Sequence, residues 1–292
     1  MIIYHAANAI GIYGYNSHNL TLENVKVISY GNPWGANPCP SRRPFLGQDC
    51  TNIKILGGEN TTMTNVLVDS GSRGISCVRC PNSVFTSLVA LNARGPYAGG
   101  SALQFTYSDN SIVENFSVLA DLDIAWQEDS FSVYRSSNFT VRDGVIHNNN
   151  APTGMCLMFE GSKQGVHGGL VEDVEARGCG GCFSGYPMTD MVQRNNVCAS
   201  PLCPSENDTL RYKPKAVGWT AGDNAKYGVV GDNILVENSY YYDPCPVDKE
   251  FNLYWEAHEG YFANGAPGIS EILDYEYRIP FENEFDFEHC GF

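Results

Sequence analysis

The sequence predicts an all-β fold, a right-handed parallel β-helix of about eight coils, and three observations support this. An asparagine-centred motif recurs along the chain, and short runs of alternating apolar and polar residues precede its copies. β-Branched residues, glycine and asparagine dominate where a helical repeat would carry alanine, leucine, glutamate and lysine. Crossovers between parallel strands are right-handed, and a solenoid grows by adding coils, so residues 1–292 are expected to form one domain.

The recurring motif spans nine residues. Its first residue is usually Asn, its fourth and ninth residues are apolar, and its sixth is Asn, Asp or Ser. Asparagine tolerates left-handed backbone and bonds neighbouring backbone groups. Copies stacked at about 4.8 Å are therefore expected to form an inward-facing ladder of side-chain amides. The first residues of the copies are Asn19, Asn60, Asn82, Asn110, Asn138, Gly168, Asp190 and Asn233.

The strands of the coils are predicted from alternation of apolar and polar residues over a few positions. In chain order these runs cover residues 11–13, 74–78, 102–105, 130–133 and 155–159. Counting 28 residues from coil to coil aligns Ile75, Leu103 and Phe131 in one column, which we expect to point into the core. Residues 155–159 are apolar throughout, so the orientation of that strand stays open; Leu157 and Phe159 are one inward choice.

Composition excludes two classes of partner. The 292-residue chain has a net charge of −15 and no lysine- and arginine-rich run, so nucleic acid is not an expected partner. It has no stretch of about 18 apolar residues that would span a membrane. The chain enters its first coil almost at once, so we expect a signal peptide and an N-terminal cap to lie upstream in a longer protein. The oligomeric state stays open.

The cysteines favour a secreted or cell-surface protein, because pairs that flank loops are typical of disulfides formed in an oxidising compartment. Eleven cysteines are present. The expected pairs are Cys39–Cys50, Cys198–Cys203 and Cys245–Cys290, of which the last would hold a C-terminal tail, residues 245–292, against the last coil. The alternative is a zinc site, suggested by Cys77-x-x-Cys80 and Cys179-x-x-Cys182, although Cys77 falls on an inward strand position.

Loop lengths predict where a site would lie. Long insertions at residues 29–49 and 198–227 and short turns in the central coils would leave an open trough along the middle of the solenoid. The 28-residue register stacks Arg73, Ser101 and Asp129 before one strand of each coil and Arg79, Tyr107 and Arg135 after it.

The candidate site residues are those that this register gathers along the trough. Adjacent carboxylates raise each other's pKa, which suits a general acid. Arginines suit a carboxylated sugar, and aromatic rings offer faces for sugar rings. The catalytic candidates are Glu128, Asp129, Tyr134 and His147, and the substrate-binding candidates are Arg73, Arg79, Gln104, Tyr107, Trp126, Arg135 and Glu160. The acidic chain permits bound Ca²⁺, but no EF-hand-like loop is present, and no cofactor or metal ligand is assigned.

The segment from Glu128 to Val141 resembles the polygalacturonase pattern of paired acids, an alternating strand and then Ser-x-Asn. The whole chain resembles the right-handed parallel β-helix superfamily, which includes pectate lyases, polygalacturonases, alginate lyases and mannuronan epimerases. The resemblance implies that Glu128 and Asp129 occupy the positions of two catalytic carboxylates. The Asn-Thr-Asp, Gly-His-Gly and Tyr-Gly-Phe-Asp-Pro-His segments of these families are absent, so the resemblance concerns the fold, and one fold hosts many functions.

Two hypotheses of function follow. The first is an enzyme acting on an acidic polysaccharide. A lyase or epimerase would neutralise the uronate with Arg73, Arg135 or Ca²⁺ and use His147 or Tyr134 as base. A hydrolase would use Asp129 as acid with Glu128, Asp123 or Glu160 as its partner, and their separation would decide retention or inversion. The second hypothesis is a non-catalytic β-helix that binds glycans or serves in adhesion.

Overall fold

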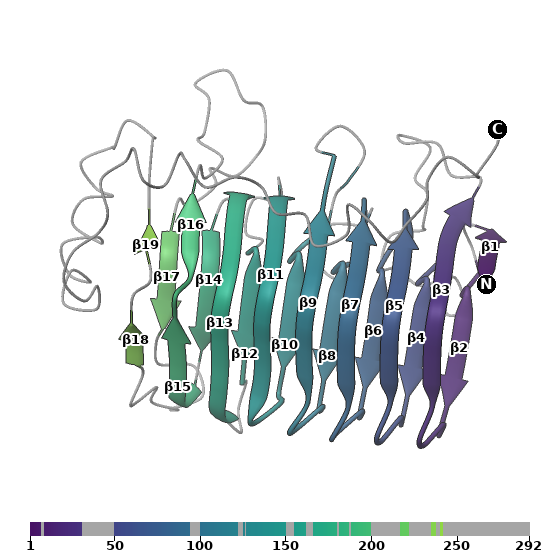
Figure 1. Ribbon diagram of the computed structural model, residues 1–292, viewed down its shortest axis with the longest axis horizontal. Coiled ribbons are helices and arrows are strands. Elements are labelled where there is room, and N and C mark those ends of the chain that lie inside the picture. The colour runs from purple at the N-terminus through teal and green to yellow at the C-terminus, as the bar shows by residue number, and fades with distance from the viewer. Residues whose placement is uncertain are drawn as a thin grey trace, which may run out of the picture.

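In a computed structural model, the chain winds into a right-handed parallel β-helix whose strands form two long sheets (Figure 1). The structure describes residues 1–6, 9–30, 50–93, 100–121, 125, 127–149, 155–161, 166–179, 181–186 and 188–199, together with the strand residues 217–221, 235–237 and 240–241. Successive strands from β1 to β15 alternate between the sheets, so each of these coils contributes one strand to each. The strands within each sheet pair in parallel with the strands one coil before and after them.

Sheet A contains the longer strands. They are β1 (Ile2–Ala6), β3 (Thr21–Tyr30), β5 (Thr62–Asp69), β7 (Val84–Leu91), β9 (Ile112–Leu119), β11 (Phe139–Asn149), β13 (Val166–Cys179), β15 (Met188–Arg194) and β18 (Leu235–Glu237), with β16 (Val197–Ala199) and β19 (Tyr240–Tyr241) beside them.

Sheet B contains β2 (Ile12–Tyr15), β4 (Ile53–Leu56), β6 (Ile75–Val78), β8 (Leu103–Thr106), β10 (Phe131–Tyr134), β12 (Leu157–Glu160), β14 (Gly181–Tyr186) and β17 (Val217–Ala221). Its eight strands agree with the number of coils that the repeat predicts.

The core lies between the two sheets and is built from columns of stacked side chains. Ile75, Leu103 and Phe131 are in register and fully buried, which confirms the predicted inward column. Leu157 and Phe159 also point inward, which settles the orientation of the apolar run 155–159. Aromatic rings from both sheets meet in this core: the ring centroids of the pairs Phe85–Phe105, Phe116–Phe131 and Phe105–Phe139 are 4.7, 5.3 and 5.3 Å apart.

The asparagine ladder is present, but its side chains do not point inward. The Nδ2 atoms of Asn60, Asn110 and Asn138 donate hydrogen bonds to the Oδ1 atoms of Asn19, Asn82 and Asn110 at 3.2, 3.3 and 3.1 Å. All five residues are exposed and have φ between 52° and 57°. The expectation of inward amides was therefore wrong. These residues turn the chain between the sheets, and the left-handed conformation directs their side chains to the outside of that turn.

The second polar position of the motif is also left-handed. Its residues bulge out of sheet A near the middle of each long strand, with φ between 52° and 55°: Asn24, Asn65, Ser87, Asn115, Asp143, Asp173 and Asn195. Asparagine adopts this conformation with little penalty, whereas most other residues do not. The recurring motif thus marks two positions in each coil where the backbone is left-handed.

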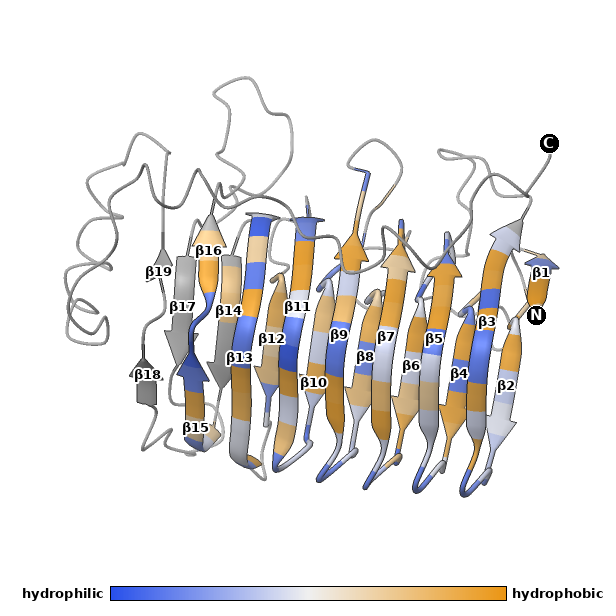
Figure 2. Cartoon of the chain, in the orientation of Figure 1, coloured by the Kyte–Doolittle hydropathy of each residue, from blue (hydrophilic) through white to orange (hydrophobic). Residues whose placement is uncertain are grey.

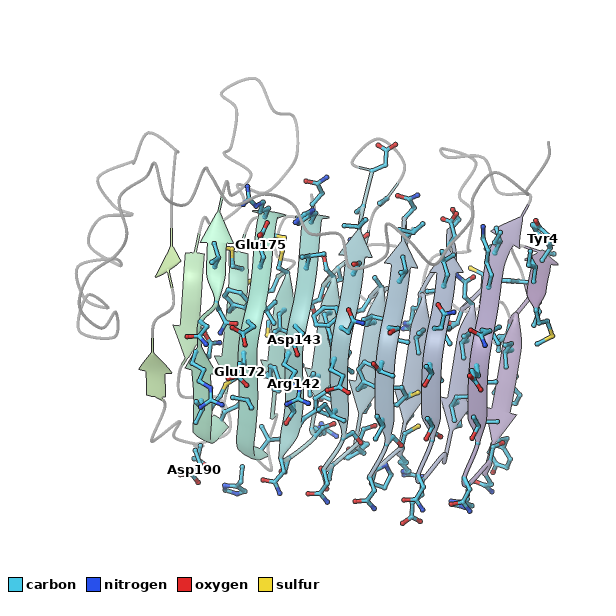
Figure 3. The ribbon with its side chains drawn as sticks, viewed as in Figure 1. Tyr4, Arg142, Asp143, Glu172, Glu175 and Asp190 are labelled. Atoms are coloured by element: carbon cyan, nitrogen blue, oxygen red, sulfur yellow. A yellow bond between two sulfur atoms is a disulfide. The ribbon has the colours of Figure 1, made fainter. Side chains whose placement is uncertain are left out.

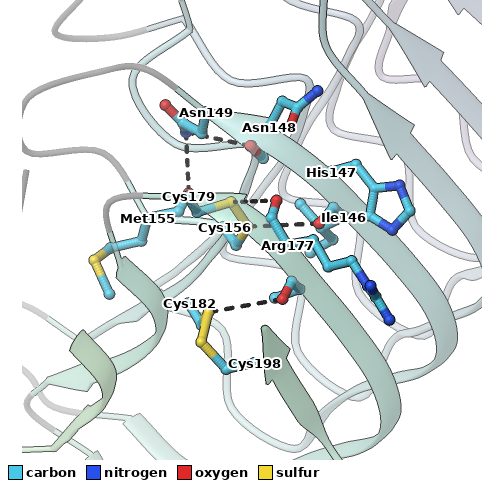
Figure 4. The surroundings of a disulfide bond; sticks show 12 residues. Ile146, His147, Asn148, Asn149, Met155, Cys156, Arg177, Cys179, Cys182 and Cys198 are labelled. Carbon is cyan, nitrogen blue, oxygen red and sulfur yellow. Dashed lines mark hydrogen bonds between the residues drawn. A yellow bond between two sulfur atoms is a disulfide. The ribbon is translucent and has the colours of Figure 1, made fainter. Parts of the chain in front are cut away.

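Two disulfides connect the two sheets (Figure 4): Cys156, just before β12, is bonded to Cys179 at the end of β13, and Cys182 of β14 is bonded to Cys198 of β16, each with Cα atoms 5.8 Å apart. The predicted Cys198–Cys203 pair is therefore wrong, because Cys198 is bonded to Cys182 in the opposite sheet. Cys50 is also disulfide-bonded. The other members of the predicted pairs, Cys39, Cys203, Cys245 and Cys290, lie outside the described residues, as does the tail 245–292.

The disulfides also bear on the zinc alternative. Cys179 and Cys182 are both bonded to other cysteines, so this pair does not bind zinc. Cys77 and Cys80 are free and buried, as the inward position of Cys77 predicts. Within the described residues, no group of three or more potential metal ligands occurs. The described part of the chain also contains no helix with the length and hydrophobicity of a membrane span.

The two edges of the solenoid differ in their connections. In the coils up to β13, chain segments that run from sheet B to sheet A are short turns, at residues 16–20, 57–61 and 79–83 among others. Segments that run from sheet A to sheet B include both the short connection 70–74 and the longer stretches 31–52, 92–102 and 120–130. The short turns expected in the central coils therefore occur throughout one edge and at only some coils of the other. The two long insertions expected to bound a trough lie largely outside the described residues.

The ladder makes a prediction about Asn110, which both donates and accepts an amide hydrogen bond. Asn110→Ala should lower the free energy of unfolding by about 1–3 kcal/mol, because alanine is strained at positive φ and both bonds are lost. Asn110→Gly loses the same bonds without the strain and should cost less. Urea unfolding measures both, and equal losses would show that backbone conformation does not matter at this turn.

Candidate functional site

Several charged residues on the outward face of sheet A form ion pairs between adjacent coils, although burial and the nearby carboxylate of Asp173 raise the pKa of Asp143 on the same face. Because the strands are parallel and in register, side chains of adjacent coils lie side by side. Arg142 donates to Glu114 at 2.6 Å, and Arg194 pairs with Glu172. Figure 3 shows Arg142, Asp143 and Glu172 on this face. Alternating charge along a column stabilises neighbouring coils and indicates a structural role.

Beside sheet B, the carboxyl groups of Glu128, Asp129 and Glu160 lie close enough to interact. Asp129 lies two residues before the start of β10, and Glu160 ends β12, which pairs with β10 in sheet B. Burial raises the pKa of Asp129 to about 7. The nearby carboxylates of Glu128 and Glu160 also raise it, whereas a hydrogen bond from the backbone of Met155 opposes the shift. Burial and Glu128 also raise the pKa of Glu160, against the opposing charge of Arg135.

Asp129 is held by a small hydrogen-bonded framework. The Met155 amide donates to its Oδ1 atom at 3.0 Å. Asn149, at the end of β11, donates from Nδ2 to the carbonyl oxygens of Glu128 and Met155 at 2.9 and 3.3 Å. Asn149 is buried and connects the two segments that flank Asp129 (Figure 4). Sequence reasoning missed this positioning residue, which stands in a run of three asparagines that the repeat does not explain.

A guanidinium group is fixed at the other end of the same strands. The Cζ atom of Arg135 lies 4.7 Å from the ring centroid of Tyr134 and 5.6 Å from that of Tyr107. Its Nη1 atom also donates to the Tyr107 hydroxyl. Cation–π contact and a hydrogen bond together restrict an otherwise flexible side chain. A planar, fixed guanidinium is suited to bind a carboxylate.

Arg79, Tyr107 and Arg135 also have an unusual backbone. Their φ values are 58°, 53° and 52°, and they continue a left-handed column that begins with Asn16 and Gly57. Asparagine and glycine are the usual residues there, whereas arginine and tyrosine carry a penalty. Backbone strain of this kind clusters at functional sites. Three consecutive coils therefore carry, at this turn, residues that suit its backbone less well than asparagine or glycine.

The structure brings most of the predicted site residues onto or beside sheet B. Asp129, Glu128 and Glu160 interact electrostatically, as do Glu160 and Arg135. Gln104 lies on β8, where it pairs in register with Ser132 of β10. Arg73 occupies the position of Asp129 two coils earlier, as the pairings of β6, β8 and β10 show.

One predicted site residue lies in the other sheet, and another lies outside the described residues. His147 is on β11 of sheet A, where its Nε2 atom lies 3.3 Å from Glu175 Oε1, and Figure 4 shows it near Arg177. It therefore belongs to a different sheet from Glu160 and Arg135. Trp126 lies outside the described residues.

Comparison with family models and with curated proteins finds no match. Among solved structures, the enzymatically active domain of tailspike protein 2 of bacteriophage CBA120 is similar to this chain, with a TM-score of 0.43 and 11% sequence identity. The match covers 84% of this chain and 38% of that one, so this chain spans well under half of that chain's length.

The raised pKa of Asp129 makes a prediction about stability. An aspartate ionises near 3.8 in the unfolded chain and near 7 here, so the folded protein is favoured at low pH and loses this contribution as pH rises from about 4 to 7. At about 1.4 kcal/mol per pKa unit, the loss is up to roughly 4 kcal/mol. Asp129→Asn should therefore stabilise the protein at pH 8 and change little at pH 4.

Urea midpoints of the parent and the variant at both pH values measure this difference. Glu23→Gln removes an exposed carboxyl on β3 and is the control, which should behave alike at both values. A stability gain for Asp129→Asn that is equal at pH 4 and pH 8 would contradict the shifted pKa.

Proposed function

We propose that this protein is a secreted glycoside hydrolase that cleaves an acidic polysaccharide on the outward side of sheet B. The observation that carries the proposal is the carboxyl of Asp129, whose pKa of about 7 arises beside two further carboxyl groups. General acids work best when their pKa lies near the working pH. A structural carboxylate would instead be paired with a cation, as Glu114 is with Arg142.

Asp129 is the general acid of the proposed reaction. In its protonated form it donates a proton to the glycosidic oxygen as the bond to the leaving sugar breaks. An ionised partner, Glu128 or Glu160, either activates water or attacks the anomeric carbon, and the distance between the two carboxyl groups across the bound sugar decides the stereochemistry. The buried Asn149 holds the segments on both sides of Asp129, so the acid is positioned before substrate arrives.

Arg135 is the proposed partner for a substrate carboxylate. Its guanidinium is restrained by Tyr107 and Tyr134, so binding costs little side-chain entropy. Arg79, in the same left-handed column two coils away, would extend the binding surface along the solenoid. The tyrosine rings beside Arg135 offer apolar faces to a sugar ring. The two disulfides of the described region support secretion, because such bonds persist in oxidising compartments.

The raised pKa favours hydrolysis over the other chemistries. A lyase or epimerase needs a base that removes a ring proton, and His147, the histidine proposed for it, is bonded to Glu175 in sheet A. A purely adhesive protein gains nothing from a carboxyl kept protonated at a cost in stability. Product analysis separates the three: reducing ends alone indicate hydrolysis, an unsaturated product indicates elimination, and binding without products indicates adhesion.

The role of Asp129 gives the first functional prediction. Asp129→Asn keeps the shape and should lower turnover of an acidic polysaccharide by roughly 10²–10⁴-fold. In the parent protein, turnover should fall as pH rises through about 7, because the acid loses its proton. Reducing-end assays across pH measure both, with Glu23→Gln as the control. Full activity of Asp129→Asn, or a rate that rises through pH 7, would contradict the assignment.

The role of Arg135 gives the second functional prediction. Arg135→Ala should weaken binding of a carboxylated polymer roughly 10- to 100-fold, since a charge-assisted hydrogen bond contributes about 1.5–3 kcal/mol. Binding of the same polymer with its carboxyls esterified should change far less. Arg142→Ala, which removes a guanidinium from sheet A, is the matched control and should affect neither polymer. Equal losses for both polymers would show that Arg135 does not recognise the carboxylate.

A further inference from the structure

The chain contains five Asn-x-Ser/Thr triplets, three of which begin with an asparagine of the ladder. They are Asn19-Leu20-Thr21, Asn60-Thr61-Thr62, Asn115-Phe116-Ser117, Asn138-Phe139-Thr140 and Asn207-Asp208-Thr209. The last of them lies outside the described residues. In secreted proteins this triplet is the acceptor of N-linked glycans when it lies on the surface. The asparagines of the ladder triplets are exposed, at the short turns between the sheets that Figure 2 colours as hydrophilic, and are therefore candidates for glycan attachment.

Of the four triplets that the structure describes, the one that begins at Asn19 is the most accessible. Asn19 and Thr21 are both exposed, and Leu20 between them is half-buried. Asn19 lies in the turn between β2 and β3, where its φ of 55° turns its side chain outward. A glycan-transferring enzyme must reach the amide of the first residue and the hydroxyl of the third. In this triplet both groups belong to exposed residues.

The other described triplets are less accessible, because each of them contains a buried residue. Thr61 and Phe139, the middle residues of two triplets, are fully buried. Ser117, the third residue of another triplet, is only 1% exposed. The hydroxyl of Ser117 is therefore out of reach in the folded protein, and the backbone around Thr61 and Phe139 is held against the core.

The side-chain amide of Asn19 also differs from those of the other triplets in its hydrogen bonds. The Nδ2 atoms of Asn60, Asn115 and Asn138 each donate to a residue of the preceding coil, at 3.2, 3.1 and 3.1 Å. Asn19 accepts the bond from Asn60 through Oδ1, and no described residue accepts one from its Nδ2 atom. An N-linked glycan replaces one hydrogen of Nδ2 and places a bulky ring beside it. At Asn19 this attachment costs the ladder no hydrogen bond.

We propose that Asn19 is an N-glycosylation site. The proposal rests on the secretion that the proposed function includes, and not on hydrolysis. The donor is an oligosaccharide carried on a lipid pyrophosphate. The Nδ2 atom of Asn19 attacks C1 of the first sugar, so that the C1–N bond forms and the C1–O bond to the pyrophosphate breaks. Nδ2 gives up one proton, and the lipid pyrophosphate is the leaving group.

A glycan at Asn19 also leaves the proposed binding surface open. Asn19 follows β2, and four strand spacings, about 19 Å, separate β2 from β10 along sheet B. Asn138, in contrast, lies in the same turn as Arg135, between β10 and β11. A glycan on Asn138 would stand beside the guanidinium proposed to bind the substrate carboxylate, whereas one on Asn19 stands clear of it.

Secretion of the full chain from cultured eukaryotic cells, directed by an added signal peptide, tests the proposal. A peptide N-glycosidase converts each glycosylated asparagine to aspartate, and mass spectrometry of the digest locates the change. Asn19 should be converted in most molecules of the parent protein. Thr21→Ala destroys the triplet and should abolish this conversion, whereas Thr21→Ser preserves the triplet and should retain it. Thr62→Ala, in register with Thr21 in the next coil, is the matched control and should leave conversion of Asn19 unchanged.

Three results would overturn the proposal. Asn19 that is recovered unconverted from the secreted parent protein means that this turn is not glycosylated. Conversion of Asn60 or Asn138 to the same extent as Asn19 means that exposure and amide contacts do not select the site. Conversion of Asn19 that persists in Thr21→Ala means that the change is not N-glycosylation. The far-ultraviolet circular dichroism of each variant should match that of the parent, and the reducing-end assay decides the proposed hydrolysis separately.

Discussion

Each coil of this chain closes through backbone positions where φ is positive. Left-handed backbone costs an ordinary residue roughly 1–2 kcal/mol, so the turns depend on asparagine, glycine and aspartate at Asn19, Asn60, Gly168 and the positions equivalent to them. Amide hydrogen bonds between stacked asparagines then tie each turn to the next. Register follows from these turns. A slip of one residue would exchange the inward and outward faces of every strand and expose the core.

The candidate site lies where the protein departs from this rule. Arg79, Tyr107 and Arg135 occupy left-handed positions that suit them poorly, and Asp129 keeps a carboxyl in surroundings that disfavour its charge. Both features lower stability, and both fall on or beside the strands of sheet B. On sheet A, Glu114 and Arg142 neutralise each other, although burial and Asp173 raise the pKa of Asp143 there. Residues that lower the stability of the folded protein in one region of a structure are common at functional surfaces.

The sequence predicted what depends on periodicity and missed what depends on contacts between the two sheets. The repeat placed Asn82, Asn110 and Asn138 in one column, and the 28-residue spacing aligned Ile75 with Phe131, because register is linear along the chain. The bond between Cys182 and Cys198 escaped prediction, since it joins neighbours in space that no local loop brings together.

The other differences between the predicted and the observed structure also concern directions and contacts that linear spacing does not specify. The outward direction of the ladder amides follows from the hand of the turn, which residue type alone does not show. His147 was grouped with Asp129 by counting one coil forward, but counting does not tell which of the two sheets a residue joins. Asn149 escaped prediction because its role is to connect two loops, and its partners are backbone atoms of Glu128 and Met155.

The ladder has a further consequence for how such a protein changes in length. The turns at Asn82, Asn110 and Asn138 recur at intervals of 28 residues and bond through identical groups. The turns of these coils therefore make the same contact with the coil before and the coil after. If one 28-residue unit were gained or lost, the coils on either side would still meet through matching turns. The strained column from Arg79 to Arg135 lies on these same interchangeable coils. A duplication there would lengthen this column by one step, so the length of the column and the number of coils are free to change together.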